Sequence, residues 1–315
     1  MDKRRLQGTD LDVSVICYGP MRAPQSEDDP ATARHQRALS AAIDHGVNFI
    51  HSSYEYGVRW MMTPVLRDHP RRHELLHVIK APVPDWDDPE FDPNKLEMRI
   101  DEALRDLCTD RIALVQWMWR CRPHEEPARI ALLERIRDAV AEAFVRLREK
   151  GKVAHMATFP YFPQSAQAAL DIEGNRALIA YYNPIEMEML SAIGDAASRG
   201  QGFIAIRPLY EGVLTDRFAD HADVPSDHRL AAPKYSSAFA HRARLAEALP
   251  EAAESMTRFA TRFPLMLESC ASVVVGLNSE EQVAELCGHA QGVPPDPKTV
   301  AAARAIYDRM TWQEG

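Results

Sequence analysis

The sequence lacks any long apolar run. Nowhere do 18 apolar residues follow one another, and the N-terminal residues Met1 to Arg5 include no apolar signal segment. A membrane span needs a longer apolar stretch, and an export signal needs an apolar segment near the N-terminus. We therefore expect a soluble cytoplasmic protein with no membrane partner.

Cysteine is scarce, and no two cysteines are closely spaced in the sequence. The five cysteines are Cys17, Cys108, Cys121, Cys270 and Cys287, and no two of them form a CxxC pair. An odd count without close spacing is typical of reduced thiols, not of a disulfide framework, a zinc knuckle or an iron–sulfur cluster. We expect most of these side chains to be small core residues, and we expect no metal site.

Clusters of basic residues are also absent. The chain carries a formal charge of −9, and no Lys- or Arg-rich stretch offsets it, which argues against a nucleic-acid partner. Hydrophobic residues make up 46% and charged residues 26% of the 315 positions, so the chain can bury a large core. This length permits one large barrel or two ordinary domains.

What the sequence does contain is a regular series of short apolar runs that end at polar or turn residues, as buried parallel strands do. The predicted strands are residues 13–18, 47–50, 76–80, 112–117, 153–158, 178–182, 203–207 and 272–276. Segments of helical period lie between most of them. The predicted helices are residues 33–45, 95–107, 128–150, 187–198 and 280–288, with Gly46 and Gly151 after the first and third.

This alternation is typical of an α/β protein, a (β/α)8 TIM barrel. We see no linker or repeat and expect a single domain over residues 1–315. Residues 210–230 have little periodicity and are expected to form a long, mobile loop after the seventh strand, of the kind that closes over a ligand. Residues 120–127 form another loop after the fourth strand.

Ionisable residues follow two neighbouring strands of the predicted barrel. Tyr54-Glu55-Tyr56-Gly57 comes after the second strand, and Lys80 closes the third. In such barrels the chemistry takes place where the strands end. A Tyr beside a Lys is a recognisable acid pair, since an ammonium stabilises phenolate and lowers the pKa of the phenol towards neutrality.

Several motifs occur in an order that resembles the aldo-keto reductase superfamily over nearly the whole chain. They lie at residues 4–14, 44–50, 102–112, 151–153, 182–184, 208–214 and 275–282. The first is similar to the N-terminal hairpin that closes the bottom of that barrel. No single motif is specific, but the ordered set is.

The resemblance implies reduction of a carbonyl in a small molecule, with hydride from NADPH or NADH and a proton from a Tyr. The Tyr falls on Tyr56, and the Lys that tunes it falls on Lys80. The position of the Asp that pairs with this Lys holds His51. The position of the substrate-orienting His holds Met118. Half of the catalytic tetrad is therefore altered.

The cofactor positions also depart from the family pattern. The Ser-Asn and Gln that hold the nicotinamide carboxamide correspond to Phe159, Pro160 and Ile179, which offer no side-chain amide. Gln282 matches the residue that grips the 2′-phosphate, and Leu286 a usual Asn. A backbone phosphate cradle could survive, and Arg207 would add charge to it. The implied cofactor residues are Arg207, Pro208, Leu209, Gly212, Leu214, Gly276, Asn278, Ser279 and Gln282.

These substitutions have physical consequences. A buried Lys80 without a carboxylate favours its neutral form and would not acidify Tyr56. His51 would accept a hydrogen bond from Lys80, shuttle protons near neutral pH, or be a structural histidine. We expect Glu55 to point outward into solvent. Aromatic residues beside Met118 would form an apolar floor for a flat ligand. The expected substrate pocket comprises Tyr54, Trp117, Met118, Trp119 and Phe159.

Three functions are compatible with this sequence. The favoured one is an NAD(P)H-dependent reductase that uses Tyr56, Lys80 and His51. The second is a non-redox proton-transfer enzyme on the same barrel, an isomerase or a dehydratase, which would tolerate a damaged cofactor site. The third is a non-catalytic binding protein that retains the fold. The substrate, the direction of reaction and the oligomeric state are not readable from the sequence.

Overall fold

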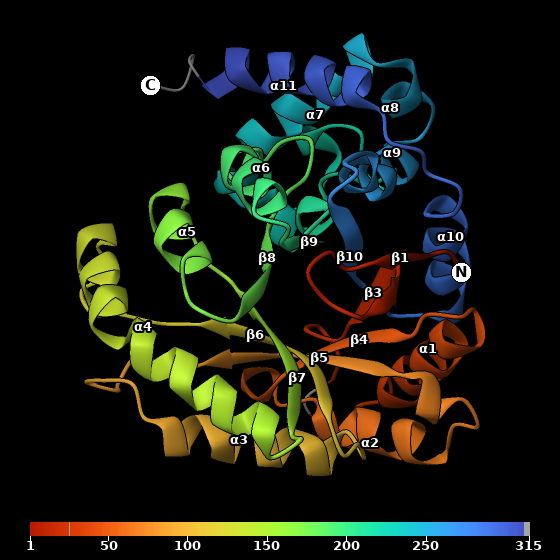
Figure 1. The fold of residues 1–315 in the computed structure, drawn as a ribbon. Coiled ribbons are helices and arrows are strands. Elements are labelled where there is room, and N and C mark those ends of the chain that lie inside the picture. The colour runs from red at the N-terminus through yellow and green to blue at the C-terminus, as the bar shows by residue number, and fades with distance from the viewer. Residues whose placement is uncertain (25, 312–315) are drawn as a thin grey trace.

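The computed structural model describes residues 1–24 and 26–311 and contains a closed barrel of eight parallel strands (Figure 1). The strands run in chain order around the barrel, and β10 pairs with both β9 and β3 to close it. The barrel strands are β3 (Ile16–Gly19), β4 (Phe49–Ser53), β5 (Leu76–Pro82), β6 (Ile112–Met118), β7 (Val153–Thr158), β8 (Asn175–Tyr181), β9 (Gly202–Ile206) and β10 (Cys270–Gly276). The predicted TIM barrel is confirmed.

The first predicted strand divides into two elements. Asp12–Ser14 forms β2, which pairs antiparallel with β1 (Lys3–Arg5), and the barrel begins only at Ile16. The side chain of Arg4 donates hydrogen bonds to the carbonyls of Leu265, Cys270 and Val293, so the hairpin is anchored beside the start of β10. The N-terminal hairpin expected from the family resemblance is therefore present.

Helices surround the strands (Figure 1). They are α1 (Thr32–Asp44), α2 (Arg59–Asp68), α3 (Pro93–Asp106), α4 (Glu126–Glu149), α5 (Pro163–Leu170), α6 (Leu190–Ser198), α7 (Ser236–Ala248), α8 (Pro250–Glu254), α9 (Met256–Arg262), α10 (Glu280–His289) and α11 (Pro297–Thr311). The glycines predicted to follow two of them, Gly46 and Gly151, have positive φ values of 87° and 72°. A left-handed residue at this point ends a helix, and glycine adopts it at the least cost.

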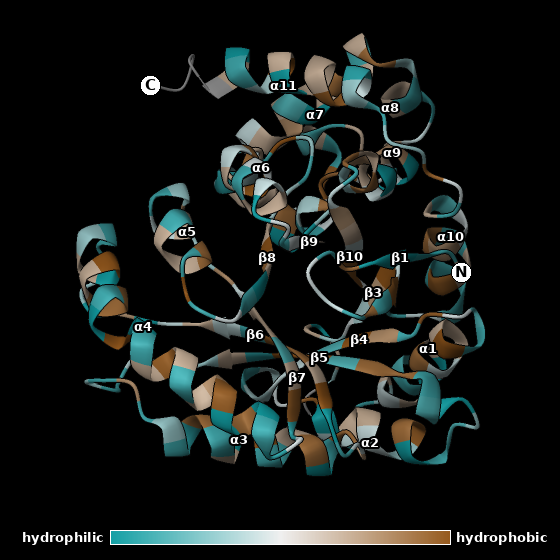
Figure 2. Cartoon of the chain, in the orientation of Figure 1, coloured by the Kyte–Doolittle hydropathy of each residue, from teal (hydrophilic) through white to brown (hydrophobic). Residues whose placement is uncertain are grey.

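The core has two layers, as alternating strand side chains require. A small cluster fills the barrel interior with residues such as Phe49, Val78 and Leu114. A larger cluster joins the outer faces of the strands to the apolar faces of the helices, whose hydrophilic faces point outward (Figure 2). Each strand is thus buried on both sides, which explains why the strands are nearly continuous apolar runs.

The segment predicted as a long loop, residues 210–230, contains short 3-10 turns. These are Tyr210–Gly212, His221–Asp223 and Arg229–Ala231. The carboxylate of Glu211 accepts hydrogen bonds from Arg229, Tyr235 and Arg22, so it ties parts of this segment to the loop after β3. Among the described residues, no helix combines the length and apolar character needed to cross a membrane.

Candidate active site

Two adjacent strands and the turn after the first of them carry the candidate catalytic residues. His51 is the third residue of β4, and Lys80 lies opposite Ser53 in the register between β4 and β5. Phe49 and Val78 belong to the interior cluster, so the alternation of the strands directs His51 and Lys80 to the interior as well. Tyr56 follows in a 3-10 turn that starts directly after β4.

The structure brings Tyr56, Lys80 and His51 together. The ammonium of Lys80 lies 5.8 Å from the centre of the Tyr56 ring. The rings of His51 and Tyr56 have centres 5.9 Å apart. The convergence of a phenol and an amine at one mouth of the barrel, which the sequence predicted, is therefore present.

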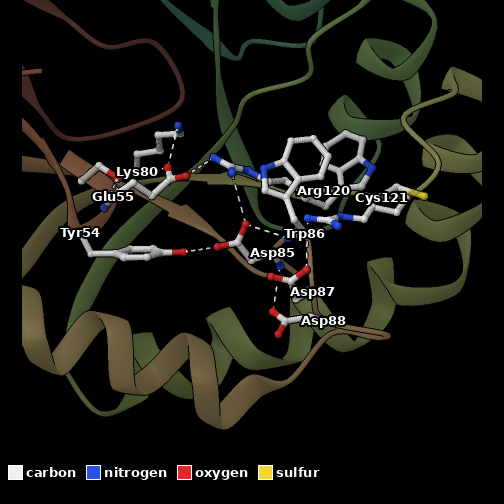
Figure 3. Close-up of polar contacts among 12 residues, drawn as sticks. Tyr54, Glu55, Lys80, Asp85, Trp86, Asp87, Asp88, Arg120 and Cys121 are labelled. Carbon is white, nitrogen blue, oxygen red and sulfur yellow. Dashed lines mark hydrogen bonds and ion pairs between the residues drawn. The ribbon is translucent and has the colours of Figure 1, made fainter. Parts of the chain in front are cut away.

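Glu55 is the counter-ion of Lys80. Its carboxylate lies 2.7 Å from the Lys80 ammonium, and the two side chains are only 18% and 13% exposed (Figure 3). The expectation that Glu55 points outward and leaves Lys80 without a carboxylate is wrong. The turn reverses the chain after β4, and Ser53 caps it by accepting a hydrogen bond from the Glu55 amide, so the glutamate returns over the mouth.

A chain of charged groups extends from this pair. Arg120, two residues beyond β6, donates to the Glu55 carboxylate and pairs with Asp85 at 3.3 Å (Figure 3). The hydroxyl of Tyr54 donates to Asp85 at 2.6 Å. Charge-assisted bonds of this kind fix side chains that would otherwise be mobile. Arg120, which is itself bound to Asp85, thus fixes the position of the Lys80–Glu55 pair.

Tyr56 does not become a strong acid in this environment. Burial raises the pKa of its phenol above the ordinary value, and the Glu55 carboxylate raises it further. The fall of the Tyr56 pKa expected from a neighbouring Lys is therefore wrong, because burial of the phenol disfavours its charged form. The phenol is protonated at neutral pH and can act as a proton donor.

His51 is neutral at neutral pH. Burial lowers its pKa to about 4, and the positive charges of Lys80 and Arg59 act in the same direction. Its Nε2 lies 2.8 Å from the side-chain oxygen of Gln116 on β6, so Nε2 donates and Nδ1 remains the acceptor. The alternatives in which His51 bonds to Lys80 or titrates near neutral pH are not supported. A neutral histidine in the barrel interior fits the geometry.

The five residues expected to line the substrate pocket lie in different places. Tyr54 turns away towards Asp85, and the guanidinium of Arg99 lies 3.9 Å from its ring centre. Trp117 and Trp119 stack on each other with centres 5.2 Å apart in the layer between strands and helices. Their indole nitrogens donate to backbone carbonyls, so they do not form a floor. Met118 is fully buried at the end of β6.

Only Phe159 is close to other aromatic residues of the mouth. Its ring centre lies 5.2 Å from that of Tyr161 and 5.5 Å from that of Tyr181. Phe159 is 3% exposed, and the other expected carboxamide contact, Ile179, is fully buried inside the barrel. Neither position offers a hydrogen bond to an amide ligand.

Arg207, after β9, is already paired. Its guanidinium makes two hydrogen bonds to Glu186 and lies 3.6 Å from Glu211. The rings of Tyr181 and Tyr210 lie on it at 4.5 and 4.7 Å. An incoming phosphate would have to displace a carboxylate that is itself largely buried.

In the loop after β9, several backbone amide groups donate hydrogen bonds within the loop itself. The N–H groups of Tyr210, Gly212, Val213 and Leu214 donate to carbonyls of the same loop at 2.8 to 3.2 Å. A backbone phosphate cradle needs such N–H groups to point at the ligand. Pro208 has none to offer. Four amides of the expected cradle are therefore engaged within the loop.

The second part of the expected cofactor site, at the start of α10, is also engaged. Ser279 caps the helix, and the side-chain oxygen of Gln282 accepts hydrogen bonds from the backbone and side chain of Asn278. Glu280 and Glu281 put two carboxylates in the first turn. They complement the helix dipole and disfavour an added phosphate. Taken with the carboxamide positions, the side chains present offer a nicotinamide dinucleotide few of the contacts that the resemblance implies.

Some residues of the site were missed by the sequence analysis. Gln116, Arg120, Tyr161, Tyr181 and Glu186 were given no role in it. A signal existed for Arg120, because it follows a barrel strand by two residues, where barrels place their functional groups. Gln116 was recognisable as an amide inside an apolar strand. Within residues 1–24 and 26–311, no three His, Cys, Asp or Glu side chains are arranged to hold a metal ion.

Comparison with known proteins identifies relatives along nearly the whole chain. The model of the Aldo/keto reductase family matches residues 15–308. The chain is 23% identical over 347 aligned residues to L-galactose dehydrogenase of Arabidopsis thaliana, covering 100% of this chain and 98% of that protein.

Solved structures show the same fold. The glycerol dehydrogenase of Gluconobacter oxydans superposes with a TM-score of 0.76 at 19% identity, covering 98% of this chain and 96% of that one. The holo form of an aldo-keto reductase from Bacillus halodurans superposes with a TM-score of 0.71 at 18% identity, covering 97% and 96%. At these identities the likeness to solved structures establishes the fold and nothing finer.

Proposed function

The chain belongs to the Aldo/keto reductase family, and on that premise we propose that it interconverts a carbonyl and a hydroxyl group of a small molecule, with Tyr56 transferring the proton. The observation that carries this proposal is the convergence of Tyr56, Lys80 and Glu55 at the mouth of the barrel. A proton donor must lie within reach of the oxygen it protonates, and a barrel mouth gives a substrate that access.

The roles of the residues follow from their surroundings. A Tyr56 phenol with a raised pKa holds its proton at neutral pH and can donate it to a carbonyl oxygen as negative charge develops there. Lys80 stabilises the resulting phenolate, and Glu55 fixes the position of Lys80. Met118 cannot orient a substrate by hydrogen bonding, so this role falls to other side chains of the mouth.

The family resemblance implies NADPH or NADH as the hydride donor of such a reaction. The residues at the expected carboxamide and phosphate positions offer this cofactor few side-chain contacts. The structure therefore supports the proton donor of the proposed reaction, and the hydride donor that the reaction also needs is proposed from family membership alone. The redox assignment draws its support from family membership. The names of two relatives, an L-galactose dehydrogenase and a glycerol dehydrogenase, accord with alcohol and carbonyl chemistry.

The poor match between these residues and a nicotinamide cofactor favours a second candidate function. Tyr56, Lys80 and a neutral His51 would suffice for a proton-transfer reaction without a cofactor, such as an isomerisation or a dehydration. The observation behind it is that four N–H groups of the loop after β9 donate within the loop and that Arg207 is paired with Glu186. This reaction needs no dinucleotide site.

Cofactor binding separates the two candidates. NADPH and NADH are titrated into the pure protein to millimolar concentration, with calorimetry and tryptophan emission as readouts. Saturable binding of either one, with turnover of aldehydes or alcohols, supports the reductase. No binding of either removes it, and the second candidate then predicts that deuterium from solvent enters a carbonyl substrate without cofactor.

Substitution of Tyr56 tests the proton donor in both cases. Tyr56→Phe should lower turnover by about 10²- to 10⁴-fold, the usual contribution of a general acid. Tyr182→Phe is the matched control, because the Tyr182 side chain is fully buried in the core layer between strands and helices, where it stacks on Phe263. An unchanged rate in Tyr56→Phe would remove Tyr56 from the mechanism.

A further inference from the structure

A cavity lies beside the candidate active site, between the loop after β5, the loop after β6 and the first half of α4. Its volume is about 520 Å³. Its lining residues include Trp86, Arg120, Cys121, Ala131, Leu132 and Arg135. Figure 3 shows the first three of these near the Lys80–Glu55 pair. Tyr56, Lys80 and His51 do not line this cavity, so it is distinct from the mouth that holds the candidate acid.

Part of the cavity wall is apolar. Ala131 and Leu132 follow Ala128 by three and four residues, so the three side chains lie on one face of α4. Trp86 comes from the loop after β5, and the guanidinium of Arg120 lies 4.9 Å from the centre of its ring. Stacking of this kind fixes the plane of an indole in advance of binding. This wall suits a compact hydrocarbon body, either a short chain or a ring.

Two arginines of the lining can change partner at little cost. Arg122 pairs with Asp87 and Arg135 pairs with Glu90, and the two arginine side chains are 60% and 57% exposed. Ion pairs that are this exposed contribute little, so a ligand can take over either guanidinium. Asp87 is itself 89% exposed and stays solvated when Arg122 turns to a ligand.

The other charges of the lining are fixed. Asp88 holds the ammonium of Lys95 with both carboxylate oxygens, at 2.6 and 2.7 Å. Arg120 is only 10% exposed, and its guanidinium is paired with Glu55 and Asp85. The charges that remain available to a ligand are therefore mainly positive. A guanidinium presents planar donors that match the two oxygens of a carboxylate.

We propose that this cavity binds a small organic acid, a carboxylate on a compact apolar body, and that its occupancy is coupled to the Lys80–Glu55 pair. The apolar body lies against α4 and Trp86, and the carboxylate bonds to Arg122 or Arg135. This ligand is an effector and not a substrate, because the cavity is not lined by the candidate catalytic residues. The inference goes beyond the proposed function and does not depend on it, since binding requires no turnover.

Arg120 connects the cavity to the candidate active site. It lines the cavity, and its guanidinium donates to Glu55, which in turn holds the Lys80 ammonium at 2.7 Å. A bound carboxylate therefore adds negative charge close to a guanidinium that Glu55 already neutralises. Like charges at this range repel, so the ligand and the ionised Glu55 weaken each other. Such coupling is reciprocal, and each group reports on the other.

Cys121 provides a reporter inside the cavity. It is partly exposed, Cys108 is exposed outside the cavity, and the other three cysteines are buried. The full-length protein is treated with iodoacetamide, and mass spectrometry gives the alkylation rate of each thiol. The probes are benzoate and hexanoate. Benzyl alcohol lacks the charge, benzylamine reverses it, and acetate lacks the apolar body.

The expected result is selective protection of Cys121. Benzoate or hexanoate should slow its alkylation at concentrations about tenfold lower than any of the three control compounds, and the rate at Cys108 should stay unchanged. Equal slowing at both thiols overturns the proposal. Protection by a control compound at the same concentration as the acids also overturns it, and so does the absence of protection by either acid at tens of millimolar.

Variants of the lining locate the binding, with calorimetry on benzoate and hexanoate as the readout. Replacing Arg122 and Arg135 together by Gln should weaken binding by about tenfold. Arg137→Gln is the matched control, because Arg137 lies on the same helix, is 51% exposed and does not line the cavity. Ala131→Phe fills the cavity and should abolish binding, whereas Ala139→Phe, also at an exposed position of α4, should not. Equal affinity in all variants overturns the assignment to this cavity.

The coupling has its own test. Glu55→Gln removes one negative charge from Arg120 and should strengthen binding of benzoate or hexanoate by about threefold. Glu186→Gln is the matched control, since Glu186 is a similarly shielded carboxylate that pairs with Arg207 and does not line the cavity. Thermal unfolding checks each variant, and Asp85→Asn, which frees the same guanidinium, replaces Glu55→Gln if that variant does not fold. Unchanged affinity in the folded variant overturns the coupling.

Discussion

Glu55 holds the ammonium of Lys80 at 2.7 Å from a turn that follows β4, whereas Lys80 itself lies on β5 (Figure 3). The strand position at which the family resemblance expects a carboxylate carries His51. The counter-ion has thus moved from the strand to the turn that follows it. Arg120 binds the same carboxylate, so one glutamate compensates two cations that are largely shielded from water.

Replacing Glu55 should therefore destabilise the protein. In Glu55→Gln two buried cations lose their shared partner, and breaking such a pair costs about 3 kcal/mol. Urea unfolding at pH 7 measures the loss. Glu90→Gln is the matched control, because the Glu90–Arg135 pair is more than half exposed and should contribute less than about 0.5 kcal/mol. Equal stability of Glu55→Gln and the parent protein would show that the pair is not needed.

His51 predicts how stability depends on pH. Its folded pKa of about 4 lies below the ordinary value of 6.5, so the unfolded chain binds this proton more readily. Stability is therefore complete above pH 6.5 and is lost as the pH falls towards 4, by about 3 kcal/mol from this group. His77, with the same folded pKa, adds a similar loss.

The two contributions can be separated by substitution. His51→Gln should reduce the fall in unfolding free energy between pH 7 and pH 5, as measured by urea titration at each pH. The part that remains comes from His77 and from His35 and His289, whose pKa values burial also lowers. His73→Gln, at an exposed position, should leave the pH dependence as it is in the parent protein. A full pH dependence in His51→Gln would mean that the histidine is already charged in the folded state.

The barrel was predictable from the sequence because its strands and helices produce periodic patterns of apolar residues. Eight buried strands give apolar runs, and residues such as Gly46 mark helix ends through their own backbone preference. The division between residues 12–14 and the strand from Ile16 was not predictable in this way, since a single apolar run contains residues of both the hairpin and the barrel.

The site was predictable only in part. Tyr56 and Lys80 were recognisable because strand ends are fixed in a barrel. The direction of Glu55 was not, since it depends on Arg120 more than 60 residues later in the chain. Likewise the state of Arg207 depends on Glu186, and no local pattern indicates that pair. Electrostatic partners across a mouth are a property of the closed barrel, not of any segment.

The interdependence of Glu55 and Arg120 gives a third prediction. In a double-mutant cycle with Glu55→Gln and Arg120→Met, the unfolding free energies should be non-additive by about 1 to 3 kcal/mol, because the two groups share one buried contact. The matched cycle uses Arg122→Met and Asp87→Asn, whose pair is 60% and 89% exposed. That cycle should be additive within about 0.5 kcal/mol. Additivity in both cycles would mean that Arg120 does not position Glu55.

Cys108 provides a prediction about backbone strain. It follows α3 with φ of 53°, in the left-handed region that side chains other than glycine adopt at a cost of about 1 kcal/mol or more. The next amide, of Thr109, donates to the carbonyl of Leu104, as in a helix end that favours glycine. Cys108 is exposed, so its side chain contributes little packing. Cys108→Gly should therefore raise the unfolding free energy.

The size of that gain and its control follow from the same geometry. Relief of the left-handed strain should stabilise Cys108→Gly by about 1 kcal/mol, reduced somewhat by the extra freedom of glycine in the unfolded chain. Cys108→Ala removes the same thiol but keeps a Cβ, so its stability should stay close to that of the parent protein. A gain in Cys108→Ala equal to that in Cys108→Gly would assign the effect to the thiol, and the backbone explanation would fail.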